Sequence, residues 1–384
     1  MRLLFVTDGR SATSQNWIRH FVERGDEVYL ASTFACDVDF PVKRLEITPV
    51  AFSSTKKRDS RLGTAASRNL GPRTTVRQWL GPLTIPLSSR GLRAFIGKVK
   101  PDLVHAMRIP FEGMLAAQAN IGPPLIVSVW GNDFTLHAPS APLMKYYTRR
   151  TLSRTQALHV DCARDLRLAH ELGFGVDKPT LMIPGNGGIR GDVFYPPREP
   201  VETHRVINPR GIRAYVRNDS FFKAIPIVLA RHPEARFICS SMQGEWQALK
   251  WTKELQIEHA VQLDAPIPHA QMGGAFRSAQ VVVSPSEHDG TPNSLLEGMA
   301  CGCFPIAGDL ESIREWITHG KNGLLVNPGD PQAIADAILL GFEREDLRRE
   351  AAGLNMKLIA TRAEYQHSMM RAGEFYESVI RDFA

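Results

Sequence analysis

A glycine- and proline-rich segment, residues 284–302, carries two carboxylates at a spacing that suits the binding of sugars. A turn in it starts a predicted helix, capped by Asn293 or Ser294, whose first amides can bind a diphosphate. Asp289 precedes the turn and Glu297 lies about one turn inside the helix, so both carboxylates can face one ligand. Because carboxylates repel phosphate, we expect them to bind neutral hydroxyls, of a sugar and of a ribose. On this segment alone, an ordinary strand–helix turn with a surface glutamate is the alternative.

Short apolar runs alternate with longer amphipathic segments along almost the whole chain, which predicts strand–helix–strand units and parallel sheets covered on both faces. The series occurs twice, so we expect two doubly wound domains joined through the glycines and prolines of 184–200. Ligands of such sheets bind at the carboxyl ends of strands, which places the expected active site in the cleft between the domains. The expected strands are 3–7, 27–31, 103–106, 125–130, 157–160, 180–183, 205–208, 236–240, 261–263, 281–284, 303–306 and 323–326.

Several motifs of this sequence, in order, resemble those of GT-B-fold glycosyltransferases of family 4, the glycosyl transferases group 1. Asp289 and Glu297, followed by Gly-Met-Ala-Cys-Gly, resemble the Glu-x7-Glu region of that family. The resemblance covers nearly the whole chain except a basic insert at 50–100. Its other parts are 24–28 (Arg-Gly-Asp-Glu-Val), 101–106 (Pro-Asp-Leu-Val-His-Ala), 129–133 (Val-Trp-Gly-Asn-Asp) and 322–330 (Asn-Gly-Leu-Leu-Val-Asn-Pro-Gly-Asp).

The resemblance implies a retaining glycosyltransferase that moves a sugar from a UDP- or GDP-sugar to an acceptor hydroxyl, in polysaccharide, lipopolysaccharide or glycolipid synthesis. In that family cationic side chains and helix amides, not a metal ion, neutralise the leaving diphosphate, so no metal or other cofactor is expected. Arg210 matches the family's arginine. The family's lysine is replaced by an arginine, and Arg217 fits better than Arg213 because it precedes a predicted helix. The predicted catalytic residues are therefore Arg210, Arg217, Asp289 and Glu297.

The resemblance also implies two sets of binding residues. The predicted donor-binding residues are Gly9, Gly290, Thr291, Pro292, Asn293, Ser294, Leu295 and Glu297. The predicted acceptor-side residues are Arg10, Ser11, Arg108, Trp130 and Asp133. Two departures matter: the family's first glutamate is Asp289 here, one methylene shorter, and its histidine before Gly-x-Asp is Trp130, which can form a stacking wall or simply pack in the core.

The predicted division is an acceptor-binding domain at 1–195, which contains the basic insert 50–100 and is completed by a C-terminal helix at 363–384, and a donor-binding domain at 200–362. In both we expect Rossmann-like parallel sheets. The chain holds no run of the ~20 apolar residues that a membrane span needs. The apolar run at its start is too short for a signal peptide. Five scattered cysteines and twelve histidines without metal-ligand spacing indicate neither disulfides nor a metal site, and favour the cytoplasm.

The net charge of +6 is concentrated in one region, because residues 56–100 hold eleven basic side chains and a single acid. Such a patch suits an anionic membrane surface or a phosphorylated substrate, while nucleic acid is disfavoured because no binding motif accompanies it. A solvated loop or a flap over the acceptor is the alternative, and the glycines and prolines favour irregular structure. For a peripheral protein, we expect shallow insertion of Trp79, Leu80, Leu92, Phe95 and Ile96.

Two other functions remain open at this point. A nucleotide-sugar epimerase or phosphorylase on the same fold would act on the donor with different acceptors or none. A non-catalytic sugar-nucleotide-binding protein is less expected, because Arg210, Asp289 and Glu297 are all present. The expected partners are thus a nucleotide-diphosphate sugar, a sugar or lipid-linked acceptor and an anionic membrane surface, but no nucleic acid.

Overall fold

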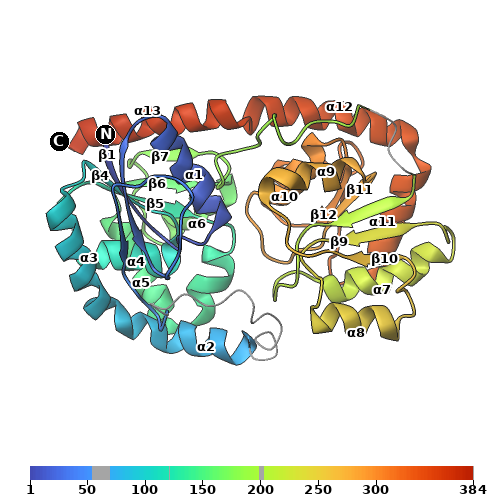
Figure 1. The fold of residues 1–384 in the computed structure, drawn as a ribbon, viewed down its shortest axis with the longest axis horizontal. Coiled ribbons are helices and arrows are strands. Elements are labelled where there is room, and N and C mark those ends of the chain that lie inside the picture. The colour runs from blue at the N-terminus through green and yellow to red at the C-terminus, as the bar shows by residue number, and fades with distance from the viewer. Residues whose placement is uncertain (54–69, 121, 199–202, 384) are drawn as a thin grey trace. The chain divides into compact units, whose positions relative to one another are not determined.

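The computed structural model describes residues 1–53, 70–120, 122–198 and 203–383. It divides into two compact units, Met1–Gly188 with Gln366–Ala384, and Ile189–Tyr365 (Figure 1). The corresponding boundaries were expected at 195–200 and at 362–363. Unit 1 is therefore discontinuous in sequence, and unit 2 is a single segment.

Unit 1 is built on seven parallel strands in the order β3-β2-β1-β4-β5-β6-β7. The first strand lies inside the sheet, where Val6 pairs with Ala31 on one side and with Ala106 on the other. The strands are β1 (Arg2–Thr7), β2 (Glu27–Ser32), β3 (Arg44–Ile47), β4 (Leu103–Ala106), β5 (Leu125–Val129), β6 (Ala157–Val160) and β7 (Thr180–Met182).

Helices cover this sheet because their apolar residues recur on one face. In α1, for example, Trp17, Ile18 and Phe21 are buried and Ser11 caps the first turn. The α-helices of unit 1 are α1 (Ala12–Glu23), α2 (Leu70–Leu80), α3 (Ile85–Val99), α4 (Met114–Ala119), α5 (Pro142–Arg154), α6 (Ala163–Glu171) and α13 (Tyr365–Phe383). Shorter helical turns are η2 (Gly81–Thr84), η3 (Ile109–Gly113), η4 (Asp133–His137) and η5 (Ala138–Ser140).

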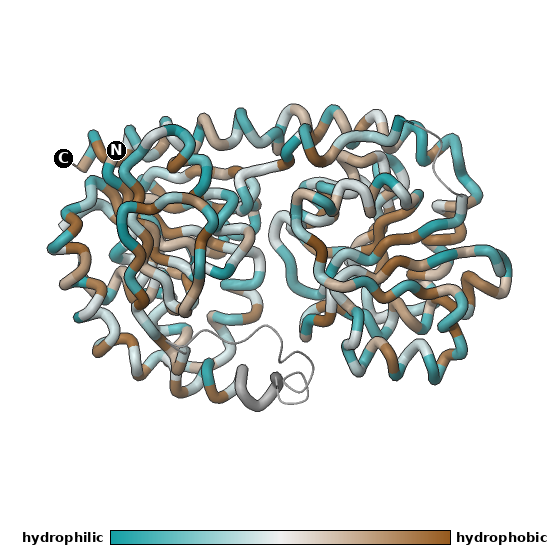
Figure 2. Tube along the Cα trace, viewed as in Figure 1, coloured by the Kyte–Doolittle hydropathy of each residue, from teal (hydrophilic) through white to brown (hydrophobic). Residues whose placement is uncertain are grey.

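Unit 2 repeats the design with six parallel strands in the order β10-β9-β8-β11-β12-β13. The strands are β8 (Arg205–Asn208), β9 (Arg236–Cys239), β10 (Val261–Leu263), β11 (Val281–Ser284), β12 (Phe304–Gly308) and β13 (Leu324–Val326). The helices are α7 (Asn218–Leu229), α8 (Trp246–Glu254), α9 (Met272–Arg277), α10 (Asn293–Ala300), α11 (Pro331–Glu343) and α12 (Glu345–Arg362), with the short turns η6 (His269–Gln271) and η7 (Ile313–Glu315). Within each unit the strands form the apolar interior, as the brown tube in Figure 2 shows.

The two doubly wound parallel-sheet domains confirm the predicted fold class, and every strand but β3 lies at an expected position. Two helical expectations were wrong. The segment at 311–318, whose amphipathic pattern predicts a helix, forms only the short turn η7. The described helical part of the basic insert, residues 70–99, contrasts with the irregular structure that its glycines and prolines favoured. Its prolines at 82 and 86 fall where helices tolerate them, because Gly81 and Pro82 begin η2 and Pro86 lies in the first turn of α3.

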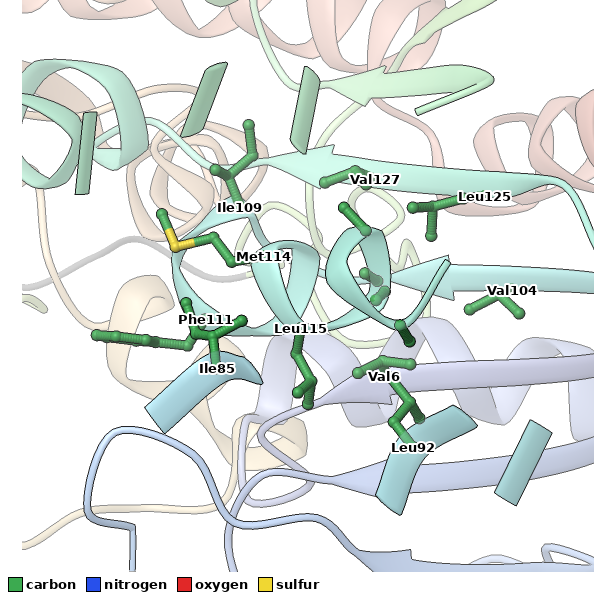
Figure 3. Packing of buried hydrophobic residues seen from close by; sticks show 14 of the residues in the cluster. Val6, Ile85, Leu92, Val104, Ile109, Phe111, Met114, Leu115, Leu125 and Val127 are labelled. Carbon is green, nitrogen blue, oxygen red and sulfur yellow. The ribbon is translucent and has the colours of Figure 1, made fainter. Parts of the chain in front are cut away.

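The apolar face of α3 belongs to the core, which corrects another expectation. Leu92, Phe95 and Ile96 are at most 6% exposed and pack against α4 in the main cluster of unit 1. Figure 3 shows Leu92 and Ile85 among these packed side chains. These three residues are therefore not available for membrane insertion. No helix within the described ranges is long and apolar enough to cross a bilayer.

A chain of buried hydrogen bonds ties the C-terminal helix to the sheet of unit 1. Trp17 Nε1 on α1 donates to the Tyr376 hydroxyl on α13 at 2.9 Å. The Tyr376 hydroxyl and His105 Nδ1 on β4 form the next bond, and His105 Nε2 bonds Ser128 Oγ on β5 at 2.7 Å. The Tyr376 ring also stacks on Phe21, with centroids 4.6 Å apart.

The chain continues from Ser128 Oγ to His159 Nδ1 at 2.8 Å, and from His159 Nε2 to the Ile183 carbonyl at 3.1 Å. An indole N–H can only donate and a carbonyl can only accept, so the two ends fix every proton between them. Both imidazoles are then neutral, with the proton on Nε2. Burial accordingly lowers the pKa of His105 and brings that of His159 down to about 4.

We expect unit 1 to lose stability in acid through these histidines. His159 stays neutral in the folded protein until about pH 4, whereas in the unfolded chain it binds a proton below about pH 6.5. The free energy of unfolding should therefore fall as the pH drops through this window, by up to about 1.4 kcal/mol per pH unit for this residue. Urea unfolding of the full chain at several pH values measures this slope.

His159→Gln should make the slope shallower, and the exposed His367→Gln is the matched control. An unchanged slope in His159→Gln contradicts the assignment.

Candidate functional site

Both sheets reverse their strand order at their first strand, between β1 and β4 in unit 1 and between β8 and β11 in unit 2. Loops that leave such neighbouring strands turn to opposite faces and open a crevice at the carboxyl ends, where ligands of doubly wound sheets bind. The predicted site residues follow β1, β4 and β5 in unit 1, and β8 and β11 in unit 2.

Two asparagines hold the loop that presents Arg210. The backbone N–H of Arg210 donates to Asn208 Oδ1 at 3.1 Å, and Asn208 Nδ2 donates to Asn218 Oδ1 at 2.9 Å. Asn218 Nδ2 then donates to the carbonyl of Gly211 at 2.7 Å. Gly211 has a φ of 61°, a left-handed conformation that glycine adopts without strain. The end of β8 is thus fixed to the start of α7, and the arginine with it.

The side chain of Arg210 brings together residues from both loops of unit 2. Its Nη2 lies 2.8 Å from Asp289 Oδ2, and its Nη1 donates to Ser294 Oγ at 3.4 Å. Arg210 and Asp289 are only 12% and 14% exposed, so the pair is largely shielded from solvent. The structure therefore places three of the predicted residues in direct contact.

Four buried polar atoms at this end of the sheet have no hydrogen-bond partner among the residues that the structure describes. They follow β8, β9 and β11 or begin α10, and they are Arg210 Nε, Ser240 Oγ, Ser286 Oγ and Asn293 Oδ1. Folded proteins rarely leave buried polar atoms unpaired. Their concentration at the strand-order reversal indicates a site whose ligand completes these hydrogen bonds.

The start of α10 differs from the expected cap. Pro292 is the N-cap residue, and no side chain caps the helix, because Asn293 and Ser294 both lie within its first turn. The first amides of α10 therefore keep no side-chain partner and can receive an anion. Thr291 accepts a hydrogen bond from Trp316 Nε1 at 3.1 Å. The side chain of Leu295 is fully buried and its amide donates to the Pro292 carbonyl at 2.8 Å, so Asn293 and Ser294 offer the first amides of the helix.

Glu297 lies further along α10 and is held by a residue that the sequence analysis missed. His269 Nε2 lies 2.7 Å from Glu297 Oε1, and the carboxylate is 6% exposed. The hydrogen bond and charge of Glu297 raise the pKa of His269. The two residues are far apart in the sequence and share no motif, so only the fold brings them together.

Arg217 is engaged differently from Arg210. Its guanidinium binds both oxygens of Asp219 at 2.9 Å and also Glu287 at 2.9 Å. These carboxylates raise its pKa further. Arg213, the alternative for the same role, donates from Nε to the Arg210 carbonyl at 3.1 Å. The charge of Arg217 is thus taken by two carboxylates, whereas Arg213 lies next to the Arg210 loop.

In unit 1, the loop after β1 is folded upon itself. Arg10 binds both oxygens of Asp8 at 2.9 and 2.8 Å, and Ser11 caps α1 by accepting from the Ser14 amide. Gly9 donates to Ser32 Oγ at 3.0 Å, and a side chain there would lie 2.4 Å from Cys36 Sγ. The lack of a side chain at Gly9 thus serves the packing of β1 against β2.

Arg108, Trp130 and Asp133 form a second group, at the ends of β4 and β5. Asp133 is fully buried and accepts from the guanidinium of Arg108 at 2.9 Å and from the amides of Ile109 and Trp130 at 3.2 Å each. It therefore joins the two loops. The indole of Trp130 is partly exposed beside Gly185, and its Nε1 has no partner within the described ranges.

Two groups of residues have ligand atoms within 4.8 Å of one another, as a metal ion would need. Asp161, Cys162 and Asp165 include a carboxylate already bound to Arg164 and a thiol whose pKa burial raises, which disfavours the thiolate that metals bind. The other group is His204, His232 and Glu234. His204 precedes β8 whereas Arg210 follows it, so this cluster lies at the opposite end of the strand from the orphaned atoms.

Two family models match most of the chain between them. The model described as glycosyl transferase 4-like domain matches residues 9–186. The model described as glycosyl transferases group 1 matches residues 212–342. The predicted family resemblance is confirmed by these matches.

Relatives of known activity are glycosyltransferases. The chain is 30% identical over 165 residues to the D-inositol 3-phosphate glycosyltransferase of Corynebacterium jeikeium, which covers 41% of this chain and 39% of that protein. It is 26% identical over 305 residues to the GDP-mannose:cellobiosyl-diphosphopolyprenol alpha-mannosyltransferase of Xanthomonas campestris, covering 73% and 74%. The match thus spans well under half the length of the Corynebacterium jeikeium protein.

Solved structures show the same fold at low identity. Sucrose-phosphate synthase from Thermosynechococcus elongatus superposes with a TM-score of 0.78 at 14% identity, covering 100% of both chains. HepE from Anabaena, solved in complex with UDP, superposes with a TM-score of 0.72 at 14% identity, covering 98% of this chain and 100% of that one. The predicted GT-B fold is confirmed by this likeness.

The contact between His269 and Glu297 can be tested in the protein without any ligand. In Glu297→Gln the carboxylate that raises the pKa of His269 is gone, while the burial that lowers it remains, so this pKa should fall. NMR titration of the histidine ring protons measures it. The exposed Glu311→Gln is the matched control and should leave His269 unchanged. An equal His269 pKa in the wild type and in Glu297→Gln refutes the pairing.

Proposed function

Since the chain belongs to the glycosyl transferases group 1 family, we propose that it moves a sugar from a nucleotide-diphosphate donor to an acceptor hydroxyl. The observation that carries this proposal is the set of four buried polar atoms without a described partner that follow β8, β9 and β11 or begin α10, a helix whose start has no side-chain cap. A ligand with phosphates and hydroxyls supplies partners for all of them. The UDP complex of a protein with the same fold supports the donor class.

The donor binds to unit 2 in this proposal, with a separate role for each side chain. Arg210 and the first amides of α10 bind the diphosphate and stabilise the charge that develops on it as the sugar leaves. Glu297, oriented by His269, binds the ribose hydroxyls, and Asp289 binds a hydroxyl of the donor sugar. Arg213 or Arg217 takes the place of the family's lysine as the second cation. Arg217 can do so only if the ligand displaces one of the carboxylates that bind it.

The reaction is proposed to retain the configuration of the transferred sugar and to need no metal ion. The leaving diphosphate is neutralised by Arg210 and backbone amides, which provide fixed dipoles and charge without a Lewis acid. The acceptor is assigned to unit 1, with Arg10, Arg108 and Trp130 beside it, and Ser11 and Asp133 in positioning roles. Gly9 remains a proposed backbone contact to the donor.

An epimerase or phosphorylase on this fold, or a binding protein without activity, is the alternative. Incubation with donor alone separates them, because an epimerase isomerises or hydrolyses the donor without an acceptor. A thermal-shift panel of UDP-, GDP- and ADP-sugars identifies the base first. A ligand at about 100 times its dissociation constant stabilises the folded chain by about 2.7 kcal/mol.

We expect Arg210→Gln and Glu297→Gln to impair donor use in different ways. Removal of Arg210 takes away a charge that acts on the leaving group, so kcat should fall by roughly 100-fold or more. Removal of the Glu297 charge weakens ribose binding, so the donor KM should rise more than kcat falls. Steady-state kinetics with the donor identified by thermal shift measure both.

Arg231→Gln, which breaks an ion pair on the surface of unit 2, is the matched control and should behave as the wild type. Wild-type kinetics in both Arg210→Gln and Glu297→Gln would refute the assignment of these residues to the donor site. Added chelator should leave the rate unchanged, and a strict requirement for Mn²⁺ or Mg²⁺ would contradict the metal-free mechanism.

We further propose that unit 1 associates with an anionic membrane surface through α2, η2 and α3. Val76, Trp79, Leu80, Leu83 and Leu87 are each between 48% and 71% exposed. Val76, Trp79 and Leu80 are three or four residues apart on α2 and thus share one face of it, and Leu87 and the exposed Arg90 do the same on α3. Apolar side chains flanked by basic ones suit shallow insertion between lipid headgroups, where each basic residue adds about 1 kcal/mol.

Sedimentation with vesicles of anionic lipid tests this surface. The wild type should bind at low salt and be released at high salt, because the basic residues act by a screened attraction. The double variant Leu83→Ser, Leu87→Ser removes apolar area that is exposed in the folded protein and should weaken binding by about tenfold or more. Leu249→Ser, which changes a leucine of unit 2 that is 51% exposed, is the control. Equal binding of all three proteins, or none at low salt, rules the membrane surface out.

A further inference from the structure

The guanidinium of Arg77 in unit 1 belongs to neither the proposed donor site nor the proposed acceptor residues. Arg77 on α2 lies between two aromatic rings, with its Cζ 4.9 Å from the centroid of Phe34 and 4.8 Å from that of Phe111. Its Nε is buried and lacks a hydrogen-bond partner within the described residues. The side chain forms no ion pair with any carboxylate that the structure describes.

The carboxylates close to Arg77 are engaged with other groups. Asp8 is bound by Arg10 through both oxygens, and Asp133 is bound by Arg108. Glu112 is buried and accepts from the hydroxyl of Thr33 at 2.8 Å. Burial lowers the pKa of Arg77; the charge of Glu112 opposes this shift, and the like charges of Arg108 and Arg10 add to it. A cation held in this setting without an anionic partner is costly, unless a ligand provides one.

The ring beneath Arg77 is held in place by a strained backbone. Phe111 has φ 69° and ψ −54°, the conformation of the rare γ-turn, which costs a bulky residue energy. Such strain persists where the surroundings enforce it, and it concentrates at functional sites. The ring of Phe111 is 6% exposed and lies in the apolar cluster that Figure 3 shows. Core packing therefore fixes the Phe111 ring that Arg77 contacts.

The position of this group in the sheet matches that of a ligand site. Arg10 follows β1, Phe34 follows β2, and Arg108 and Phe111 follow β4. These three strands are neighbours, and the strand order reverses between β1 and β4. The Arg10 guanidinium lies 3.7 Å from the centroid of Phe34, on the ring that Arg77 also contacts. Three arginines thus converge at the carboxyl ends of adjacent strands.

We propose that Arg77, with Arg10 and Arg108 beside it, forms a phosphate-binding subsite in unit 1, and that the acceptor of the transfer carries a phosphate or diphosphate group there. A guanidinium can bind phosphate through two parallel N–H···O bonds, and its planar face stacks on aromatic rings, which is how Arg77 is seated. The identification of this ligand as the acceptor rests on the proposed glycosyl transfer. The phosphate belongs either to a soluble sugar phosphate or to a membrane lipid.

The test uses the full chain saturated with the nucleoside diphosphate that binds unit 2, so that the donor site cannot take up the probe. One probe is glucose 6-phosphate, measured by titration calorimetry. The other is phosphatidylcholine vesicles with and without phosphatidic acid, measured by sedimentation. Arg77→Gln should weaken binding of the phosphate-bearing probe by about tenfold or more, as expected for the loss of a charge-assisted bond. Arg77→Lys should retain part of it.

Arg149→Gln, which removes an exposed arginine of the same unit, is the control and should bind as the wild type does. Equal binding by the wild type and Arg77→Gln, or no binding of either probe to the wild type, overturns the subsite. If no nucleoside diphosphate binds, the donor assignment fails instead. The phosphate titration then proceeds without nucleotide and still reports on Arg77.

Discussion

The strictly parallel pairing of both sheets is the constraint on which the rest of this structure depends. Parallel strands place all their carboxyl ends at one edge, and each sheet reverses its order beside its first strand, at β1 and β4 and at β8 and β11. Segments distant in sequence therefore meet at the same edge. The contact of Arg210 with Asp289 and Ser294 and the convergence of Arg10 with Arg77 and Phe34 both arise from this arrangement.

The sequence was sufficient for the elements with strong local patterns. Buried strands such as β11 are continuous aliphatic runs, and the loop between β11 and α10 combines turn residues with carboxylates, so both were predicted. The edge strand β3 has one exposed and three partly exposed residues, and its sequence, Arg-Leu-Glu-Ile, gives only a weak alternation. The pairs His269–Glu297 and Arg77–Phe111 join residues that no motif connects, so only the fold reveals them.

Many arginines of this protein are paired with aspartates, so the number of basic residues does not tell how many can bind an anionic ligand. Asp8, Asp133, Asp219 and Asp289 each hold an arginine in a fixed orientation. In the pairs of Asp8 with Arg10 and of Asp219 with Arg217, both carboxylate oxygens bind the guanidinium, which restricts the freedom of a long side chain. Arg217, predicted as a catalytic residue, is paired in this structure with Asp219 and Glu287. Arg77 is held by aromatic rings and keeps its hydrogen-bond donors.

The return of the chain to unit 1 at Gln366 has a consequence for synthesis on the ribosome. Unit 2, a continuous segment, can complete its core as soon as its last strand and helices have emerged. Unit 1 is complete only with α13, because the Tyr376 hydroxyl joins Trp17 and His105 in the buried chain of hydrogen bonds. We therefore expect unit 1 to complete its packing after unit 2, and until then the surface of Phe5 and Phe21 that contacts Tyr376 in the folded protein stays uncovered by it.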